Sequence, residues 1–484
     1  MSALTKKKSI ARLLAEAGSG ENKLHRTLGA FGLIALGIGA IIGAGLFSIT
    51  GAAAGYHAGP AVTISFVIAA VGCAFAGLCY AEFASMIPVA GSAYTYSYAT
   101  MGRFVAWIIG WDLVLEYAVG GATVAISWSR YLVKLLAYQG LEIPAQFTMS
   151  PFDTATLADG SIVTGIINFP AVIIIILVSL LLVKGTQESA LVNSLIVLLK
   201  VAVVLIFIFL GWSYINPANY DPYIVPNKGE FGDFGWSGIL RASGIIFFAY
   251  IGFDAVSTAA QEAKNPKRDM PIGILVSLGI CTVLYILFAH VMTGLAHYTE
   301  FQGQDGIAPV AVAIEHTPFK WLNQAIILAI LAGYSSVILV MLMGQSRVFF
   351  SMSKDALLPS VFSDVHSKFK TPWKSSLIIM VFVSLFAGFV PARVVGEMTS
   401  IGTLFAFVLV CAGIIILRYA QPNAPRAFRT PLVPLVPILG IASCLLMMLA
   451  LPYDTWLRLV IWMAIGIAIY FSYGHPRTES VQHD

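Results

Sequence analysis

Residues 37–47 read Gly-Ile-Gly-Ala-Ile-Ile-Gly-Ala-Gly-Leu-Phe, which places four glycines within nine residues in the middle of a long apolar segment. Inside a helix, each glycine is about 1 kcal/mol less favourable than alanine. An uninterrupted membrane helix has no use for so many, so the stretch predicts a helix that is unwound around Gly43 to Gly45. Close helix packing through small residues is the other interpretation of the same pattern.

A second stretch of this kind lies five spans further along the chain. Residues 243–254 read Ser-Gly-Ile-Ile-Phe-Phe-Ala-Tyr-Ile-Gly-Phe-Asp and combine glycine with a carboxylate at a similar depth. Glycine-interrupted helices at corresponding positions of two five-helix halves indicate an inverted-repeat transporter with its binding site near the bilayer midplane.

Apolar segments long enough to cross about 30 Å of hydrocarbon recur along the whole chain. They predict an all-α polytopic membrane protein with twelve transmembrane helices, at 28–55, 60–87, 103–134, 168–184, 189–214, 236–261, 271–296, 321–351, 374–391, 394–418, 431–451 and 455–473. We expect an amphipathic cytoplasmic segment at 1–27, one transmembrane domain at 28–473 and a cytoplasmic tail at 474–484. In that domain, repeat one covers about 28–214, repeat two about 236–418, and two additional helices about 431–473.

Composition and charge agree with this organisation. Hydrophobic residues make up 58% of the 484 residues and charged residues only 11%, whereas soluble domains carry about 25% charged residues. With the N-terminus inside, 20 of the 28 Lys and Arg residues lie on the inner side and Lys200 lies within a span. The other seven lie at or beyond the outer face: Arg130, Lys134, Lys228, Arg241, Lys320, Arg393 and Arg458. This asymmetry predicts cytoplasmic termini and insertion into the cell membrane.

Several function classes are disfavoured by the same residues. The net charge is only +4 and no basic patch is interleaved with aromatics, so nucleic acid is excluded as a partner. The five cysteines lie in apolar runs without a CxxC pair, and no metal or other cofactor is expected. An enzyme would need a nucleophile and base or a metal motif, and a channel would need a filter loop or rings of charge; the sequence shows neither.

The predicted breaks suggest what the site binds. A half-helix that starts after the first break would direct the N–H groups of Gly43, Ala44 and Gly45 at an anion such as a carboxylate. The broken ends near Phe248 and Ile251 would expose carbonyls suited to an ammonium group. Donors on one side and acceptors on the other match a zwitterion, the backbone of a free amino acid. We expect Phe248, Ile251 and Phe253 to line or cap the side-chain pocket, with plain packing as the alternative.

Lys200 is the charged residue that most needs an explanation. It lies about ten residues from either end of its span, about 15 Å from each interface. An intramembrane lysine is costly and marks a functional site by default. We favour a proton-coupling role; a fixed cation that holds helices together is the alternative.

Three carboxylates are the remaining candidates. Glu116 lies mid-way along the third span, and Asp112 precedes it by one turn on the same face. We expect Glu116 to hold a substrate ammonium or a cationic side chain, or to exchange protons. For Asp254, just past the sixth-span break, and for Asp112, we expect gating or structural roles.

Six motifs, taken together and in order, resemble the amino acid/polyamine/organocation superfamily, specifically its cationic amino acid transporter family. The first three are Gly-Ala-Gly-Leu-Phe from Gly43, Pro-Val-Ala-Gly-Ser-Ala-Tyr-Thr-Tyr from Pro88 and Trp-Asp-Leu-Val-Leu-Glu-Tyr from Trp111. The other three are Phe-Ala-Tyr-Ile-Gly-Phe-Asp from Phe248, Lys-Asn-Pro-Lys-Arg-Asp-Met-Pro from Lys264 and Gln-Ser-Arg-Val-Phe-Phe-Ser-Met-Ser-Lys-Asp-Ala-Leu-Leu-Pro from Gln345. The similarity runs from about residue 25 to 475.

The resemblance implies a LeuT-like core of five plus five helices in inverted repeat, with helices one and six discontinuous, and two additional helices. It implies carboxylate binding at Gly43, Ala44 and Gly45 and amino-group binding by the carbonyls of Ile41, Phe248 and Ile251. Lys200 matches the lysine that, in proton-coupled members, replaces a sodium ion against the first and eighth helices. Glu116 matches their third-helix acid.

Three features depart from the family pattern. Ala44 stands where relatives often carry Thr or Ser, so one hydroxyl contact to the carboxylate is missing. Arg103 stands where an acidic residue is common. The animal members have fourteen spans, so twelve spans and a short tail resemble a bacterial member.

The expected function is uptake of free L-amino acids by sodium-independent proton symport with alternating access. The substrate is cationic if Glu116 serves a cationic side chain; a small neutral amino acid such as alanine is equally expected if Glu116 serves the amino group or protons. We favour neutral or broad selectivity. An exchanger or facilitator and a polyamine carrier are the alternatives. The expected partners are the amino acid and membrane lipid, and a small membrane subunit is left open.

Overall fold

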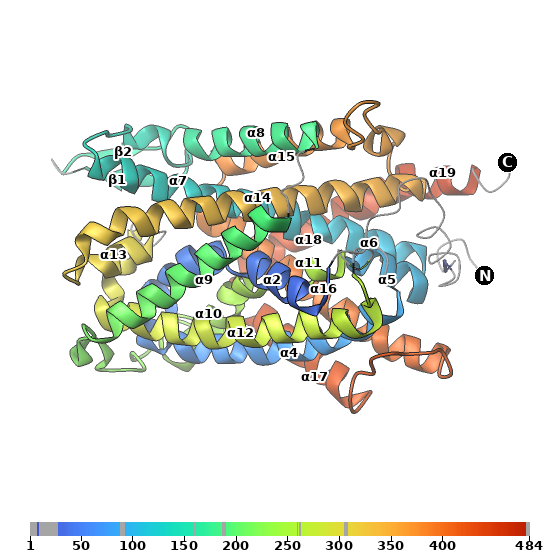
Figure 1. Cartoon of the computed structure of the whole chain (residues 1–484), viewed down its shortest axis with the longest axis horizontal. Coiled ribbons are helices and arrows are strands. Elements are labelled where there is room, and N and C mark those ends of the chain that lie inside the picture. Colours follow the sequence, from blue (N-terminus) through green and yellow to red (C-terminus); the bar gives the residue numbers. More distant parts are fainter. Residues whose placement is uncertain are drawn as a thin grey trace.

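The protein is a bundle of long helices (Figure 1). The computed structural model describes residues 7–8, 28–87, 92–157, 160–185, 190–258, 260, 263–303 and 308–480. In Figure 1 most long helices run along the long axis, with α5 and α19 at one end and the β1–β2 hairpin and α13 at the other. The predicted 1–27 segment and the Pro88–Gly91 part of one motif lie almost entirely outside the described residues.

The first half of the chain forms these elements: α2 (Ala30–Ile41), η2 (Gly45–Ile49), α3 (Thr50–Ala53), η3 (Ala54–Ala58), η4 (Gly59–Ala61), α4 (Val62–Met86), α5 (Ser92–Thr100), α6 (Arg103–Val114), η5 (Leu115–Val119), α7 (Gly120–Tyr138), η6 (Ala145–Phe147), β1 (Thr154–Thr156), β2 (Ile162–Thr164), α8 (Phe169–Lys184), α9 (Ala190–Trp212) and η7 (Pro217–Tyr220).

The second half forms α10 (Gly235–Ile246), η8 (Phe247–Tyr250), α11 (Ala255–Thr258), α12 (Pro266–Leu295), η10 (Tyr298–Phe301), α13 (Pro309–Glu315), η12 (Lys320–Leu322), α14 (Asn323–Lys354), η13 (Ser360–Ser363), α15 (Trp373–Phe389), α16 (Ala392–Ala420), α17 (Leu435–Ala450), α18 (Tyr453–Ile469), η14 (Tyr470–Gly474) and α19 (His475–Ser480).

Each of the twelve predicted segments contains helix, with ends within a few residues of those expected. By length and apolar composition, seven helical stretches among the described residues could cross a membrane, and α8, α15 and α17 are shorter apolar helices. The long elements are all helices, as the all-α fold class leads one to expect. The loop after α7 contains a short antiparallel hairpin in which Thr154 pairs with Thr164 and Thr156 with Ile162. β-branched residues dominate both strands, which suits an extended backbone.

Apolar side chains fill the core of the bundle and also line its outside. Outward-facing residues of α8, α9, α12, α17 and α18 include Leu177, Leu198, Val283, Leu449 and Val460, each about half exposed or more. An exposed apolar surface of this extent is unfavourable in water and favourable in lipid. The chain is therefore a multi-pass membrane protein.

The end of α4 is held by a buried carboxylate. Glu82 is fully buried and accepts hydrogen bonds from Arg418 Nε (2.9 Å) and Nη2 (2.8 Å), from Arg426 Nε (3.0 Å) and from the Thr430 amide (2.7 Å). Arg418 closes the last turn of α16, and Arg426 and Thr430 belong to the loop before α17. One side chain thus joins three parts of the chain.

We expect Glu82→Ala to destabilise the protein by about 3–5 kcal/mol, the usual effect of removing one partner of a buried ion pair. The reason is that Arg418 and Arg426 would keep their charges without a carboxylate. Thermal unfolding of the purified protein in detergent measures the change. Glu142→Ala, which removes an exposed carboxylate, is the matched control. Equal melting temperatures for the two variants would contradict this assignment.

Candidate functional site

The first interruption lies where α2 ends. Ile41 is its last residue, and Ile42 is extended with φ −71° and ψ 105°. The Gly43 carbonyl then accepts hydrogen bonds from the N–H groups of Leu46 (3.2 Å) and Phe47 (3.1 Å), and helical structure resumes with η2. Residues 42–44 therefore separate two half-helices within one apolar segment.

The start of the second half-helix presents free donors. Among the described residues, no hydrogen bond is found from the amide groups of Gly43, Ala44 or Gly45. All three residues are buried. The first amides of a helix have no partner inside it and lie at its positive end. Such an end can hold a carboxylate.

The second interruption follows η8. Ile251 is extended, with φ −59° and ψ 138°, and its N–H donates to the Phe248 carbonyl at 3.2 Å. Gly252 follows with φ +116°, a conformation that favours glycine, and α11 begins at Ala255. The Phe248 carbonyl, a predicted acceptor for a substrate amino group, thus also closes this turn with one of its two lone pairs.

The two interruptions meet backbone to backbone. A Cβ atom on Gly45 would lie 2.1 Å from the Ala249 Cα atom, and one on Gly252 would lie 2.7 Å from the Ala40 carbonyl. No side chain fits at either contact without movement of the backbone. The glycines that predicted the breaks therefore also allow the two broken segments to cross closely.

The last carbonyls of α2 are bound by two neighbouring helices. Lys200 on α9 is 2% exposed, and its Nζ donates to the Gly39 carbonyl at 2.7 Å. Tyr285 on α12 donates its hydroxyl to the Ile41 carbonyl, also at 2.7 Å. Lys200 thus contacts the first interrupted helix, and Ile41 keeps a second lone pair for the predicted contact with a substrate ammonium.

The predicted carboxylates form a second group. Asp112, Glu116 and Asp254 are fully buried, and Glu116 interacts electrostatically with both of the others. Asp254 accepts hydrogen bonds from the Tyr117 hydroxyl (2.6 Å) and the Gly252 amide (3.2 Å). No hydrogen bond of standard geometry reaches the carboxyl oxygens of Asp112 or Glu116 from the described residues.

The backbone at Glu116 is also unusual. Residues Leu115–Val119 form a π-helical turn between α6 and α7. Such turns in otherwise regular helices are frequent at functional sites. Tyr117 lies on this π-helical turn and donates a hydrogen bond to Asp254, just past the sixth-span break. The turn and the break are therefore in direct contact.

Comparison with known sequences identifies the family. The sequence model described as "Amino acid permease" matches residues 28–470, almost the whole bundle. The chain belongs to this amino acid permease family. The predicted membership of the amino acid/polyamine/organocation superfamily, as a bacterial member, is thereby confirmed. The family is one of transporters, which agrees with the expectation that the chain is not an enzyme.

Individual relatives are similar over 87% or more of this chain. The permease is 43% identical over 98% of both chains to the branched-chain amino acid permease BcaP of Bacillus subtilis. It is 41% identical over 99% of both chains to the methylthioribose transporter of the same organism. It is 34% identical to the vacuolar cationic amino acid transporter 4 of Arabidopsis thaliana, over 87% of this chain and 68% of that one.

The predicted pocket residues of the permease lie in two environments. Phe248 and Ile251 lie at the sixth-span turn itself. The ring of Phe253 packs against Tyr80 on α4 (5.6 Å between ring centroids) and Phe407 on α16 (5.1 Å). Phe253 therefore has an aromatic cluster as its packing partner, and its predicted contact with substrate stays a prediction.

Sequence reasoning missed three tyrosines of the permease that fix the interrupted helices. The Tyr285 hydroxyl donates to the Ile41 carbonyl and the Tyr117 hydroxyl donates to Asp254. Tyr131 on α7 donates to the Phe47 carbonyl at 2.5 Å. A signal was available, because each hydroxyl lies within an apolar span, where a polar group needs a partner. The sequence did not show which partner each would have.

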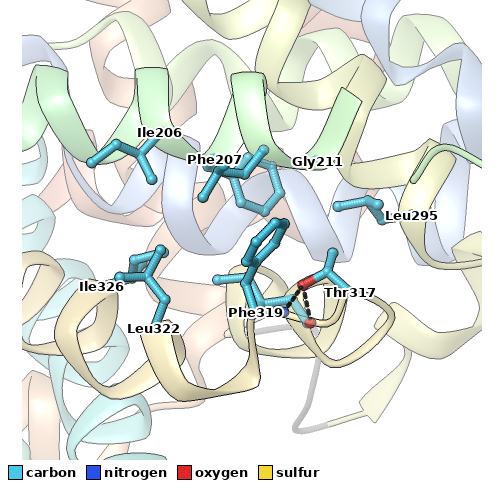
Figure 2. Close-up of a pocket in the computed structure, with 10 residues that line it drawn as sticks. Ile206, Phe207, Gly211, Leu295, Thr317, Phe319, Leu322 and Ile326 are labelled. Atoms are coloured by element: carbon cyan, nitrogen blue, oxygen red, sulfur yellow. Dashed lines mark hydrogen bonds between the residues drawn. The ribbon is translucent and has the colours of Figure 1, made fainter. Parts of the chain in front are cut away.

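One apolar pocket of the permease lies elsewhere (Figure 2). It is bounded by Phe207 and Gly211 of α9, Leu295 of α12 and Ile326 of α14, together with Phe319. The hydroxyl of Thr317 in its wall already donates to the Ile314 carbonyl (2.8 Å) and accepts from the Phe319 amide (3.3 Å). Its lining contains no charged side chain, so this pocket does not match an amino acid zwitterion.

Proposed function

We propose that the protein takes up free L-amino acids across the cell membrane by alternating access. Twelve spans with cytoplasmic termini are proposed, in two inverted five-helix repeats followed by two extra helices. The excess of Lys and Arg on one side supports this topology. Two interrupted helices that lie five spans apart, α2–η2 and α10–α11, support the inverted repeat.

The zwitterion site lies where these two interrupted helices cross. The single observation that carries the proposal is the contact of Gly45 with Ala249 beside that of Gly252 with Ala40. In this crossing, the amides of Gly43 to Gly45, which make no hydrogen bond to any described residue, lie next to the broken end of the sixth span. The amides would hold the carboxylate, and the carbonyls of Ile41, Phe248 and Ile251 would hold the ammonium group.

Coupling to protons is proposed through Lys200 and Glu116. The Lys200 ammonium bonds to the Gly39 carbonyl, so a change in its protonation changes a contact of the first interrupted helix. Glu116 shares a buried environment with Asp112 and Asp254, and a change in its charge would alter the contacts of the sixth-span break. No sodium ion or other cofactor is required. Asp254 and Asp112 act in gating. The partners of the protein are the amino acid substrate and membrane lipid.

We propose a neutral amino acid of the branched-chain type as the substrate. The aromatic and aliphatic side chains of Phe248 and Ile251 at the site, and the high identity to a branched-chain amino acid permease, support this. A cationic amino acid is the second candidate, because the buried Glu116 carboxylate could pair with a cationic side chain. Methylthioribose has neither carboxylate nor ammonium, so it does not use the features of this site.

Uptake into sodium-free proteoliposomes tests the proposal. We expect an inward proton gradient to stimulate uptake of labelled leucine, and excess unlabelled arginine or methylthioribose to compete about tenfold less well than isoleucine. Strong competition by arginine that is lost in Glu116→Gln would instead assign Glu116 to a cationic side chain. Uptake that ignores the gradient and requires internal amino acid would show an exchanger, with Lys200 as a structural cation.

A further inference from the structure

The stem of Lys200 lies against a glycine of the helix opposite. A Cβ atom built on Gly333 of α14 would lie 3.0 Å from Cε of Lys200, 3.1 Å from Cγ and 3.5 Å from Cδ. Two of these distances are shorter than ordinary contacts between carbon atoms, which are about 3.5–4.0 Å. The lysine stem therefore occupies the space that a side chain at position 333 would need.

A second glycine lies at the other end of this lysine. Val197 lies one turn before Lys200 on the same face of α9, and a Cβ atom on Gly39 would lie 2.5 Å from its Cγ2 atom. The Lys200 ammonium bonds to the carbonyl of this same Gly39 at 2.7 Å. The lysine is thus confined between Gly39 on α2 and Gly333 on α14.

The same face of α14 also reaches the unwound segment. Val337 lies one turn after Gly333, and its Cγ2 atom would be 3.4 Å from a Cβ atom on Gly43. Two adjacent turns of α14 therefore contact the lysine stem and the predicted carboxylate site. From α12, the Cys281 thiol is close enough to Lys200 to interact with its charge. Lys200 therefore lies among α2, α12 and α14.

We propose that Gly333 is a positioning residue for proton coupling: its lack of a side chain lets Lys200 reach the Gly39 carbonyl and thereby links α14 to the first interrupted helix. This inference rests on the proposed symport function. A larger residue would displace the Lys200 stem and move its ammonium away from the Gly39 carbonyl. The hydrogen bond between these two groups is lost once they are more than about 3.5 Å apart. The loss should grow with the size of the side chain.

The test compares Gly333→Ala and Gly333→Val in proteoliposomes. Two quantities are measured: accumulation of labelled leucine driven by an inward proton gradient, and leucine counterflow without a gradient. We expect gradient-driven accumulation to fall by about tenfold or more in Gly333→Val and by less in Gly333→Ala, as when a hydrogen bond to a charged group is lost. Counterflow should fall much less, because it requires no net movement of protons.

Gly279→Val is the matched control, since a Cβ atom at Gly279 would meet nothing within 4 Å. A wild-type protein that ignores the gradient would refute the proposed symport itself. A stimulated wild type with an equally stimulated Gly333→Val would overturn only the role of Gly333. So would a Gly333→Val variant whose counterflow falls as much as its gradient-driven accumulation, because Gly333 would then act on transport in general and not on proton coupling. If Gly333→Val does not fold, Gly333→Ala decides by the same comparisons.

Discussion

Lys200→Met is expected to abolish amino acid accumulation driven by a proton gradient. Methionine has nearly the same length as lysine and fills the space beside Gly333, but it cannot bond to the Gly39 carbonyl or carry a proton. Accumulation against a concentration gradient should therefore fall to the equilibrium level, which is a loss of at least about tenfold. The measurement is uptake of labelled leucine into proteoliposomes with and without an inward proton gradient.

Lys184→Met serves as the control for loss of a lysine, because Lys184 is an exposed residue at the end of α8. It should accumulate substrate as the wild type does. Gradient-dependent accumulation that survives in Lys200→Met would assign Lys200 to a purely structural role. The search for the proton-binding group would then move to Glu116 and its neighbours Asp112 and Asp254.

The positions of the helices and their breaks could be predicted because they depend on local sequence. Long apolar segments must hydrogen-bond their backbone internally when they lie in lipid, and helices achieve this. The glycines at 43, 45 and 252 marked the interruptions because glycine weakens a helix at its own position. A single sequence therefore predicted that the first span would unwind around Gly43 to Gly45 and that the sixth span would break near Phe248 and Ile251.

The partners of the site residues could not be predicted, because they depend on how helices pack in three dimensions. Glu116 and Asp254 lie 138 positions apart, and only the packing of the third span against the sixth brings them together. Gly333 had no visible role, since a glycine in a membrane helix is ordinary. Its importance appears only when the Lys200 stem is placed beside it.

The second large effect is expected for Gly45→Ala. The new Cβ atom would lie 2.1 Å from Cα, 2.6 Å from Cβ and 2.7 Å from the amide nitrogen of Ala249. Two of these atoms are backbone, so no rotation of a side chain relieves the overlap, and the two interrupted segments must move apart. We expect leucine uptake to fall by about 100-fold, because a displacement of about 1 Å separates groups that must bind one substrate together.

A second substitution distinguishes this backbone contact from a clash between side chains. Ala249→Gly removes only the 2.6 Å contact and leaves the 2.1 Å and 2.7 Å contacts with Gly45→Ala in place. The double variant should therefore remain as inactive as Gly45→Ala, while Gly279→Ala should transport normally. Recovery of uptake in the double variant would show that the backbones at Gly45 and Ala249 can separate without loss of the site. Transport would then not require the two broken helices to cross at this distance. The amides of Gly43 to Gly45 would have to hold the substrate carboxylate without the sixth span beside them.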